Sequence, residues 1–226
     1  MTRKAILFDL DGTLVDTAPD LAAATDHALT RAGRPALGLE AVRSMVGDGA
    51  RALLEKGFKA SGGMPGPEQF ENAFTDFMVY YGRHLADTSR PFPGALTCLA
   101  SLAEQDYALA VCTNKPEGLS RSLLGQLGML DLFGAVVGGD TLAMRKPDPG
   151  HIHGTVAALN ARLGIAHGWA AMVGDSANDV NAAKAAGLPC VVVSFGYTQI
   201  PPHELGGDRL IDHFADLPEA IAALGG

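Results

Sequence analysis

Apolar residues gather in five short runs along the chain, and helical patterns follow most of them. Short continuous apolar runs are typical of strands buried on both faces of a parallel sheet. The predicted strands are Ala5–Phe8, Tyr107–Cys112, Ala135–Val137, Ala170–Val173 and Cys190–Val193. Helical spacing follows the middle three, at Ser120–Leu127, Gly150–Leu163 and Asn178–Ala186. This alternation predicts an α/β fold, a Rossmann-like parallel sheet with helices on both faces.

One connection is much longer than the others. Residues 10–106 separate the first two predicted strands, whereas a crossover between parallel strands needs only about a dozen residues. Thr17 and Asp20 have capping-box spacing before the first of four helical patterns in this stretch, which are Leu21–Ala32, Leu39–Met45, Ala50–Ala60 and Glu68–Leu85. We therefore predict a core domain of residues 1–16 and 91–226, into which an α-helical cap domain of residues 17–90 is inserted.

Composition and charge narrow the class of protein. The chain has 226 residues, of which 47% are hydrophobic, and a formal net charge of −8. This charge disfavours binding to nucleic acid or to an anionic membrane surface, because both need clustered lysine and arginine. No apolar run has the length of a membrane-spanning helix or a signal-peptide core. The three cysteines are too widely spaced to outline a disulfide framework. We expect a cytoplasmic protein that binds neither nucleic acid nor a membrane.

Polar side chains stand where the predicted strands end, which is where ligands bind in open α/β sheets. Several close carboxylates repel one another unless a cation holds them, and oxygen ligands suit Mg²⁺. The candidate carboxylates are Asp9, Asp11, Asp175 and Asp179. Groups that suit an anionic, oxygen-rich ligand accompany them, namely the turn amides at Gly12 and the side chains of Thr113, Asn114 and Lys146. This combination predicts phosphoryl transfer through an aspartyl-phosphate.

The order of these motifs resembles that of the haloacid dehalogenase superfamily of phosphohydrolases. The motifs are Asp-x-Asp-Gly-Thr at 9–13, Thr-Asn at 113–114, Lys-Pro at 146–147 and Gly-Asp-Ser-x-Asn-Asp at 174–179. Within the superfamily, segments such as Arg90-Pro-Phe-Pro-Gly94 and Thr113-Asn-Lys-Pro-Glu117 are similar to the bacterial phosphoglycolate phosphatases. The resemblance implies a Mg²⁺-dependent phosphatase that acts on a small phosphorylated metabolite. The expected substrate is 2-phosphoglycolate, which would yield glycolate and phosphate.

The resemblance also implies a role for each carboxylate. Asp9 would be the nucleophile and a metal ligand. Asp11 would protonate the leaving oxygen and then activate the hydrolytic water, with its backbone carbonyl on the metal. Asp175 would hold Mg²⁺, and Asp179 would be a further ligand or a partner of the ligands.

The remaining groups are expected around the phosphoryl oxygens. By the same resemblance, Thr113, Asn114 and the amides near Gly12 would bind those oxygens. Lys146 would bridge Asp9 and the phosphate. In the cap, the stretch from Gly47 to Arg51 is a candidate substrate contact.

Other functions share some of these sequence features. A sugar-phosphate phosphatase or phosphomutase of the same superfamily has the same motifs. Hydrolases of carbon–halogen or carbon–phosphorus bonds replace the second aspartate, so Asp11 speaks against them. A non-catalytic binding protein would not need the intact set of polar groups.

His151 and His153 could suggest a metal pair, but residues two apart on a helix do not share a face, so we expect solvated side chains.

Overall fold

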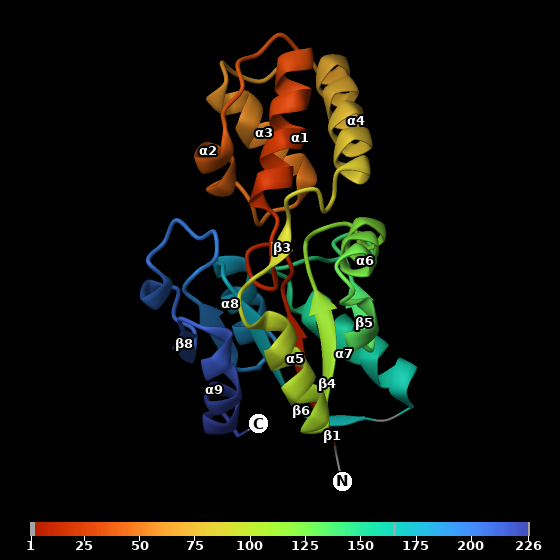
Figure 1. The fold of residues 1–226 in the computed structure, drawn as a ribbon, viewed down its shortest axis with the longest axis vertical. Coiled ribbons are helices and arrows are strands. Elements are labelled where there is room, and N and C mark those ends of the chain that lie inside the picture. The colour runs from red at the N-terminus through yellow and green to blue at the C-terminus, as the bar shows by residue number, and fades with distance from the viewer. Residues whose placement is uncertain (1–2, 165, 226) are drawn as a thin grey trace.

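The computed structural model describes residues 3–164 and 166–225, which form an α/β core with a helical body beyond one end of its sheet (Figure 1). The described residues contain a six-stranded sheet in the order β5-β4-β1-β6-β7-β8, in which every pairing is parallel. Its strands are β1 (Arg3–Phe8), β4 (Tyr107–Cys112), β5 (Ala135–Val137), β6 (His167–Gly174), β7 (Cys190–Val193) and β8 (Arg209–Ile211). The predicted fold class is confirmed.

Sequence periodicity located most of this sheet. Strands β4, β5 and β7 have the predicted bounds, β1 begins earlier than predicted, and β6 both begins earlier and ends one residue later. Strand β8 was not predicted. It has only three residues at the edge of the sheet, and Arg209 and Leu210 are exposed. An exposed edge strand lacks the continuous apolar run that marks a buried strand.

Side chains alternate between the two faces of β1. Ile6 and Phe8 pack in one apolar cluster with α5 (Ala95–Glu104), α6 (Glu117–Gln126) and α9 (Leu217–Ala223). The opposite face, with Ala5 and Leu7, packs against α7 (Pro149–Leu163) and α8 (Ala177–Ala185). Helices therefore cover the sheet on both faces, as the apolar runs predict. Short 3-10 helices complete the core at η1 (Leu130–Leu132), η2 (Pro202–Glu204) and η3 (Phe214–Asp216).

The inserted helices lie beyond the carboxyl ends of the strands (Figure 1). They are α1 (Ala18–Arg31), α2 (Leu39–Arg43), α3 (Ala50–Ala60) and α4 (Pro67–Arg83). Two short antiparallel strands, β2 (Val15–Asp16) and β3 (Arg90–Pro91), carry the chain into and out of this body. The crossing thus lies beside the predicted division at residues 17 and 90. We refer to the helices α1–α4 and the loops that join them as the cap.

The start of α1 differs from its prediction, because Thr17 makes no side-chain capping bond. The hydroxyl oxygen of Tyr197 instead accepts from the N–H groups of Thr17, at 2.7 Å, and Ala18, at 3.0 Å. Asp20 accepts from the N–H and the hydroxyl of Ser89, at 2.8 and 2.6 Å. The expected capping box is therefore wrong. Tyr197 of the core and Ser89, where the chain leaves the cap, hold this end of the helix instead.

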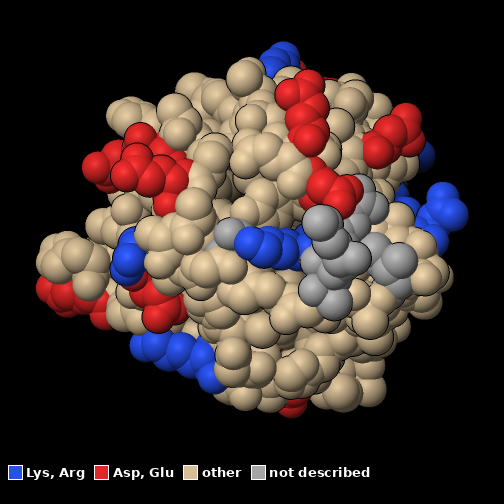
Figure 2. Space-filling model, turned by 90° about the horizontal axis from the view of Figure 1, so that it is seen from below, with Lys and Arg blue, Asp and Glu red and all other residues tan. Residues whose placement is uncertain are grey.

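At the end of the core away from the cap, acidic and basic side chains are interspersed on a largely uncharged surface (Figure 2). No helix among the described residues combines the length and the apolar character that crossing a membrane requires. The three cysteines, Cys98, Cys112 and Cys190, are buried and free.

Candidate active site

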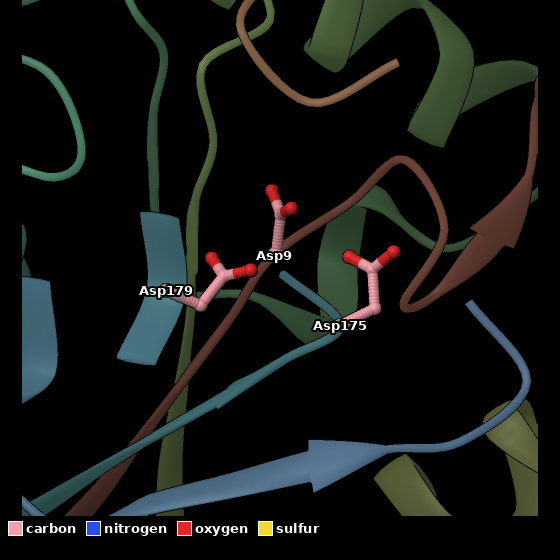
Figure 3. A group of neighbouring side chains, drawn as sticks. All are labelled: Asp9, Asp175 and Asp179. Carbon is pink, nitrogen blue, oxygen red and sulfur yellow. The ribbon is translucent and has the colours of Figure 1, made fainter. Parts of the chain in front are cut away.

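Three carboxylates from two segments of the chain converge at the carboxyl edge of the sheet (Figure 3). Asp9 follows β1, Asp175 follows the neighbouring strand β6, and Asp179 lies in the first turn of α8. One oxygen of each lies within 4.8 Å of the others, and all three residues are buried. The side chain of Asp11 is not part of this trio, and the sequence-based expectation gave it only a backbone carbonyl ligand.

Lys146 is the cation nearest to the trio. Its Nζ lies 2.6 Å from Asp179 Oδ1 and 3.0 Å from Asp9 Oδ1. Burial acts against the charge on Lys146, but Asp179 and Asp9 outweigh it and raise the pKa of the ammonium. Burial, reinforced by Asp179, raises the pKa of Asp9 to about 6, although Lys146 opposes the shift. Burial, together with the charges of Asp179 and Asp9, raises the pKa of Asp175 to about 8. One ammonium therefore leaves excess negative charge.

The donor set fits a hard divalent cation. Thr13 Oγ1 donates to Asp175 Oδ1 at 3.2 Å, and the N–H of Tyr197 donates to Asp175 Oδ2 at 2.7 Å. Asp179 Oδ2 accepts from the N–H and the hydroxyl of Ser176, at 3.0 and 2.7 Å. Asp179 is thus held by Ser176 and Lys146, Lys146 is shared with Asp9, and Asp175 has no cationic partner within 4 Å among the described residues. Oxygen ligands with this charge are those that Mg²⁺ prefers.

Two glycines allow the carboxylates to come close to the backbone. Gly12 has a φ of +86°, and a Cβ there would lie 2.6 Å from Asp175 Oδ2. A Cβ at Gly174 would lie 2.2 Å from Asp179 Cγ. The N–H of Gly12 donates to Val15 O at 3.0 Å, so it closes the turn instead of facing a ligand. The structure therefore gives Gly12 a conformational role.

A cavity lies between this edge of the sheet and the cap. The core contributes Asp9, Asp11, Thr113 and Asn114, and the cap contributes Gly47, Gly49 and Tyr81 together with apolar side chains. Four of the predicted site residues therefore face one space. Asp175, Asp179 and Lys146 pack around Asp9 without lining the cavity.

Asn114 connects the cap to the core. Its Nδ2 donates to Gly47 O at 3.1 Å and to Lys146 O at 3.0 Å. Both N–H groups are therefore in use, and its Oδ1 is buried without a hydrogen-bond partner among the described residues. In this arrangement the side chain holds the cap loop, whereas the sequence predicted that it binds phosphate. Thr113 is buried, and its Oγ1 accepts from the N–H of Lys115 at 3.2 Å.

Lys115 and Tyr81 complete the cavity wall and were missed from the sequence. Lys115 Nζ lies 3.1 and 3.3 Å from the two Asp11 carboxylate oxygens and 2.5 Å from Tyr81 Oη. Both residues are buried. A lysine directly after the Thr113-Asn114 strand end was a visible signal, whereas nothing local to the α4 pattern singles out Tyr81.

Two other expectations need correction. Arg51 lies outside the cavity, where it pairs with Glu71 at 2.8 Å and its guanidinium carbon lies 4.4 Å from the centroid of the Phe74 ring.

His151 is buried, although a solvated side chain was expected. Its Nδ1 accepts from the N–H of Lys146 at 3.2 Å, and its Nε2 donates to Gly138 O at 3.1 Å. Burial and Lys146 lower the pKa of His151 to about 4, so it is neutral and supports the Lys146 loop.

Comparison with known proteins gives a consistent result. The family model described as haloacid dehalogenase-like hydrolase matches residues 6–193. The chain is 45% identical over 224 residues to a phosphoglycolate phosphatase of Caulobacter vibrioides, covering 99% of this chain and 93% of the relative.

Solved structures share the fold. A predicted phosphoglycolate phosphatase from Haemophilus somnus superposes with a TM-score of 0.89 at 32% identity, covering 98% of this chain and 99% of the other. CbbY from Rhodobacter sphaeroides, in complex with phosphate, gives a TM-score of 0.75 at 27% identity, with 96% of both chains covered.

Proposed function

The chain belongs to the haloacid dehalogenase-like hydrolases, and from that premise we propose that it is a Mg²⁺-dependent phosphatase with 2-phosphoglycolate as its substrate. The observation that carries the proposal is the buried trio of Asp9, Asp175 and Asp179 beside Lys146, of which Asp9 lines a cavity covered by the cap. A relative of 45% identity that is named for this activity supports the choice of substrate.

In the proposed reaction Asp9 is the nucleophile. A carboxylate oxygen of Asp9 attacks phosphorus, the bond from phosphorus to the ester oxygen breaks, and an aspartyl-phosphate forms. Asp11 donates a proton to the departing ester oxygen, so that glycolate leaves as an alcohol. The Lys146 ammonium, 3.0 Å from Asp9 Oδ1, offsets repulsion between the carboxylate and the phosphate dianion. The Thr113 hydroxyl is a donor for a phosphoryl oxygen at the cavity wall.

The second half of the reaction regenerates the enzyme. A water molecule attacks phosphorus while Asp11, now a carboxylate, accepts its proton. The bond between phosphorus and Asp9 breaks, inorganic phosphate leaves, and Asp11 is protonated again for the next cycle. Asp11 lines the cavity beside Asp9, as this double role requires.

A bound Mg²⁺ would supply positive charge to stabilise the transferring phosphoryl group. Asp9, Asp175 and Asp179 are the side chains proposed to hold it. Burial and the mutual repulsion of the trio raise the pKa of both Asp9 and Asp175, and this cost of holding the carboxylates ionised is the physical reason for expecting a cation there.

A panel of phosphomonoesters tests the proposal. We expect 2-phosphoglycolate to give the highest kcat/KM when phosphate release is compared with that from hexose phosphates and nucleoside monophosphates. We also expect phosphate release to stop when a chelator removes Mg²⁺. A sugar phosphate at the head of the panel would make the protein a sugar-phosphate phosphatase. Transfer of the phosphoryl group to a sugar, instead of to water, would make it a phosphomutase.

A further inference from the structure

We propose that Lys115 is the residue that selects for the substrate's carboxylate, and that Tyr81 of the cap orients it. The inference rests on the proposed function and deepens it, because it names the group that distinguishes 2-phosphoglycolate from an uncharged phosphate ester. Neither residue takes part in the phosphoryl transfer described above.

The cavity wall combines apolar side chains with a single cationic one among the described residues. Among the described lysines and arginines, Lys115 alone lines the cavity. The cap side of the wall is apolar, with Leu21, Val46 and Leu53, and Leu119 of the core adds to it. An anion against such a wall is strongly disfavoured unless a cation or a hydrogen-bond donor reaches it. A substrate with a second negative charge therefore has one cationic partner in this space.

The position of Lys115 fits the length of the substrate. Its Nζ lies 3.1 and 3.3 Å from the oxygens of Asp11, the group proposed to protonate the ester oxygen. In 2-phosphoglycolate a single methylene separates that ester oxygen from the carboxylate. An ammonium that already contacts Asp11 is thus close to where the substrate's carboxylate would lie.

The hydrogen bonds of Lys115 leave room for a ligand. An ammonium has three N–H donors. When one is shared by the two Asp11 oxygens and a second reaches Tyr81 Oη at 2.5 Å, the third is left for a substrate oxygen. Lys115 is only 4% exposed, so water screens such a charge-assisted hydrogen bond little.

Tyr81 adds orientation from the cap. Its Oη accepts from Lys115, and the centroid of its ring lies 4.4 Å from Nζ. Burial raises its pKa well above the ordinary value, so the hydroxyl keeps its hydrogen and can donate it to the same carboxylate. Because Tyr81 belongs to α4 and Lys115 to the core, the pair forms only when the cap is seated on the core.

The test compares two substrates of similar size. 2-Hydroxyethyl phosphate replaces the carboxylate of 2-phosphoglycolate with an uncharged hydroxymethyl group. We expect Lys115→Met to lower the kcat/KM ratio of 2-phosphoglycolate to 2-hydroxyethyl phosphate by about 10- to 100-fold, as loss of one charge-assisted hydrogen bond implies. Tyr81→Phe should lower the same ratio by a smaller factor. Arg51→Ala is the matched control, because this cation lies outside the cavity, and it should leave the ratio unchanged.

Each outcome separates this inference from the proposed function. Equal losses for both substrates in Lys115→Met would overturn the inference and give Lys115 a role in positioning Asp11. If Lys115→Met left kcat/KM unchanged for both substrates, the inference would also be overturned and recognition would fall to the backbone amides near Gly47. A wild-type enzyme without preference for 2-phosphoglycolate would instead refute the proposed substrate before any variant is made. If circular dichroism shows that Lys115→Met is unfolded, Lys115→Gln, which keeps a polar side chain, provides the same comparison.

Discussion

The main-chain N–H of Tyr197 donates a 2.7 Å hydrogen bond to Asp175 Oδ2. The hydroxyl of the same residue accepts from the N–H groups of Thr17 and Ala18 and donates to Asp16 Oδ1 at 2.6 Å. One buried tyrosine thus joins a carboxylate of the candidate metal site to the segment where the chain enters the cap. The loop after β7 therefore fixes both the candidate metal site and residues 16–18, the entry segment that we call the hinge.

Removal of this hydroxyl should weaken the hinge without altering the metal site. We expect Tyr197→Phe to lower the free energy of unfolding by about 1–3 kcal/mol, because buried backbone donors lose their acceptor. Mg²⁺ affinity should stay the same, since the N–H to Asp175 is retained. Urea denaturation and a Mg²⁺ titration measure the two effects. Tyr80→Phe is the control, because it also removes a tyrosine hydroxyl but keeps a ring that stacks on His27 and His84. Equal destabilisation by both variants would refute the hinge role.

Asp9→Asn should abolish turnover while the protein stays folded. An amide is a far poorer nucleophile than a carboxylate, so we expect kcat to fall by about three orders of magnitude or more. Labelled phosphate should no longer attach to the protein after rapid acid quenching, whereas the wild-type protein should be labelled. Labelling of the Asp9→Asn variant would show that another residue is the nucleophile.

Mg²⁺ binding should strengthen as pH rises. The pKa values of Asp9 and Asp175, raised to about 6 and about 8, lie above those of carboxyls in the unfolded chain, near 4. The folded metal-free protein therefore binds more protons than the unfolded chain between these values, so its stability falls as pH rises through about 4 to 8.

Protons and the metal compete for the same oxygens, so the rise in Tm caused by Mg²⁺ should be larger at about pH 8.5 than at about pH 5.5. Differential scanning fluorimetry with and without Mg²⁺ measures the difference. Asp175→Asn should remove most of this pH dependence. A shift in Tm that does not change with pH would argue against metal binding by these carboxylates.

Gly174 should not tolerate a side chain. A Cβ would lie 2.2 Å from Asp179 Cγ, and relief of that overlap would push Asp179 away from Lys146. We expect Gly174→Ala to cost about 1–3 kcal/mol of stability and to weaken Mg²⁺ binding. Gly125→Ala in α6 is the control, because its Cβ would meet nothing within 4 Å. That variant should be neutral or gain up to about 1 kcal/mol, since alanine favours a helix. A neutral Gly174→Ala would show that the loop has room to shift.

The sequence by itself determined the framework of this protein. Buried parallel strands are encoded by local apolar runs, so β4, β5 and β7 could be placed residue by residue, and the excess of chain between β1 and β4 predicted an inserted body. Asp9 and Asp175 were identified because parallel strands end at the same edge of a sheet, which brings the residues after β1 and β6 together. These inferences need only neighbouring residues and a topological rule.

Tertiary structure alone decided which groups surround those residues. Lys115 meets Tyr81 across 34 positions of sequence, and Tyr197 meets Thr17 across 180. Nothing in either local pattern records such a partner. Because local patterns do not record such partners, the charge of Arg51 suggested a substrate contact, whereas α3 turns this side chain outward to Glu71. The same limit explains Thr17, whose capping role passes to Tyr197. Residue type predicts what a side chain can do, whereas packing of the cap on the core determines which partner it reaches.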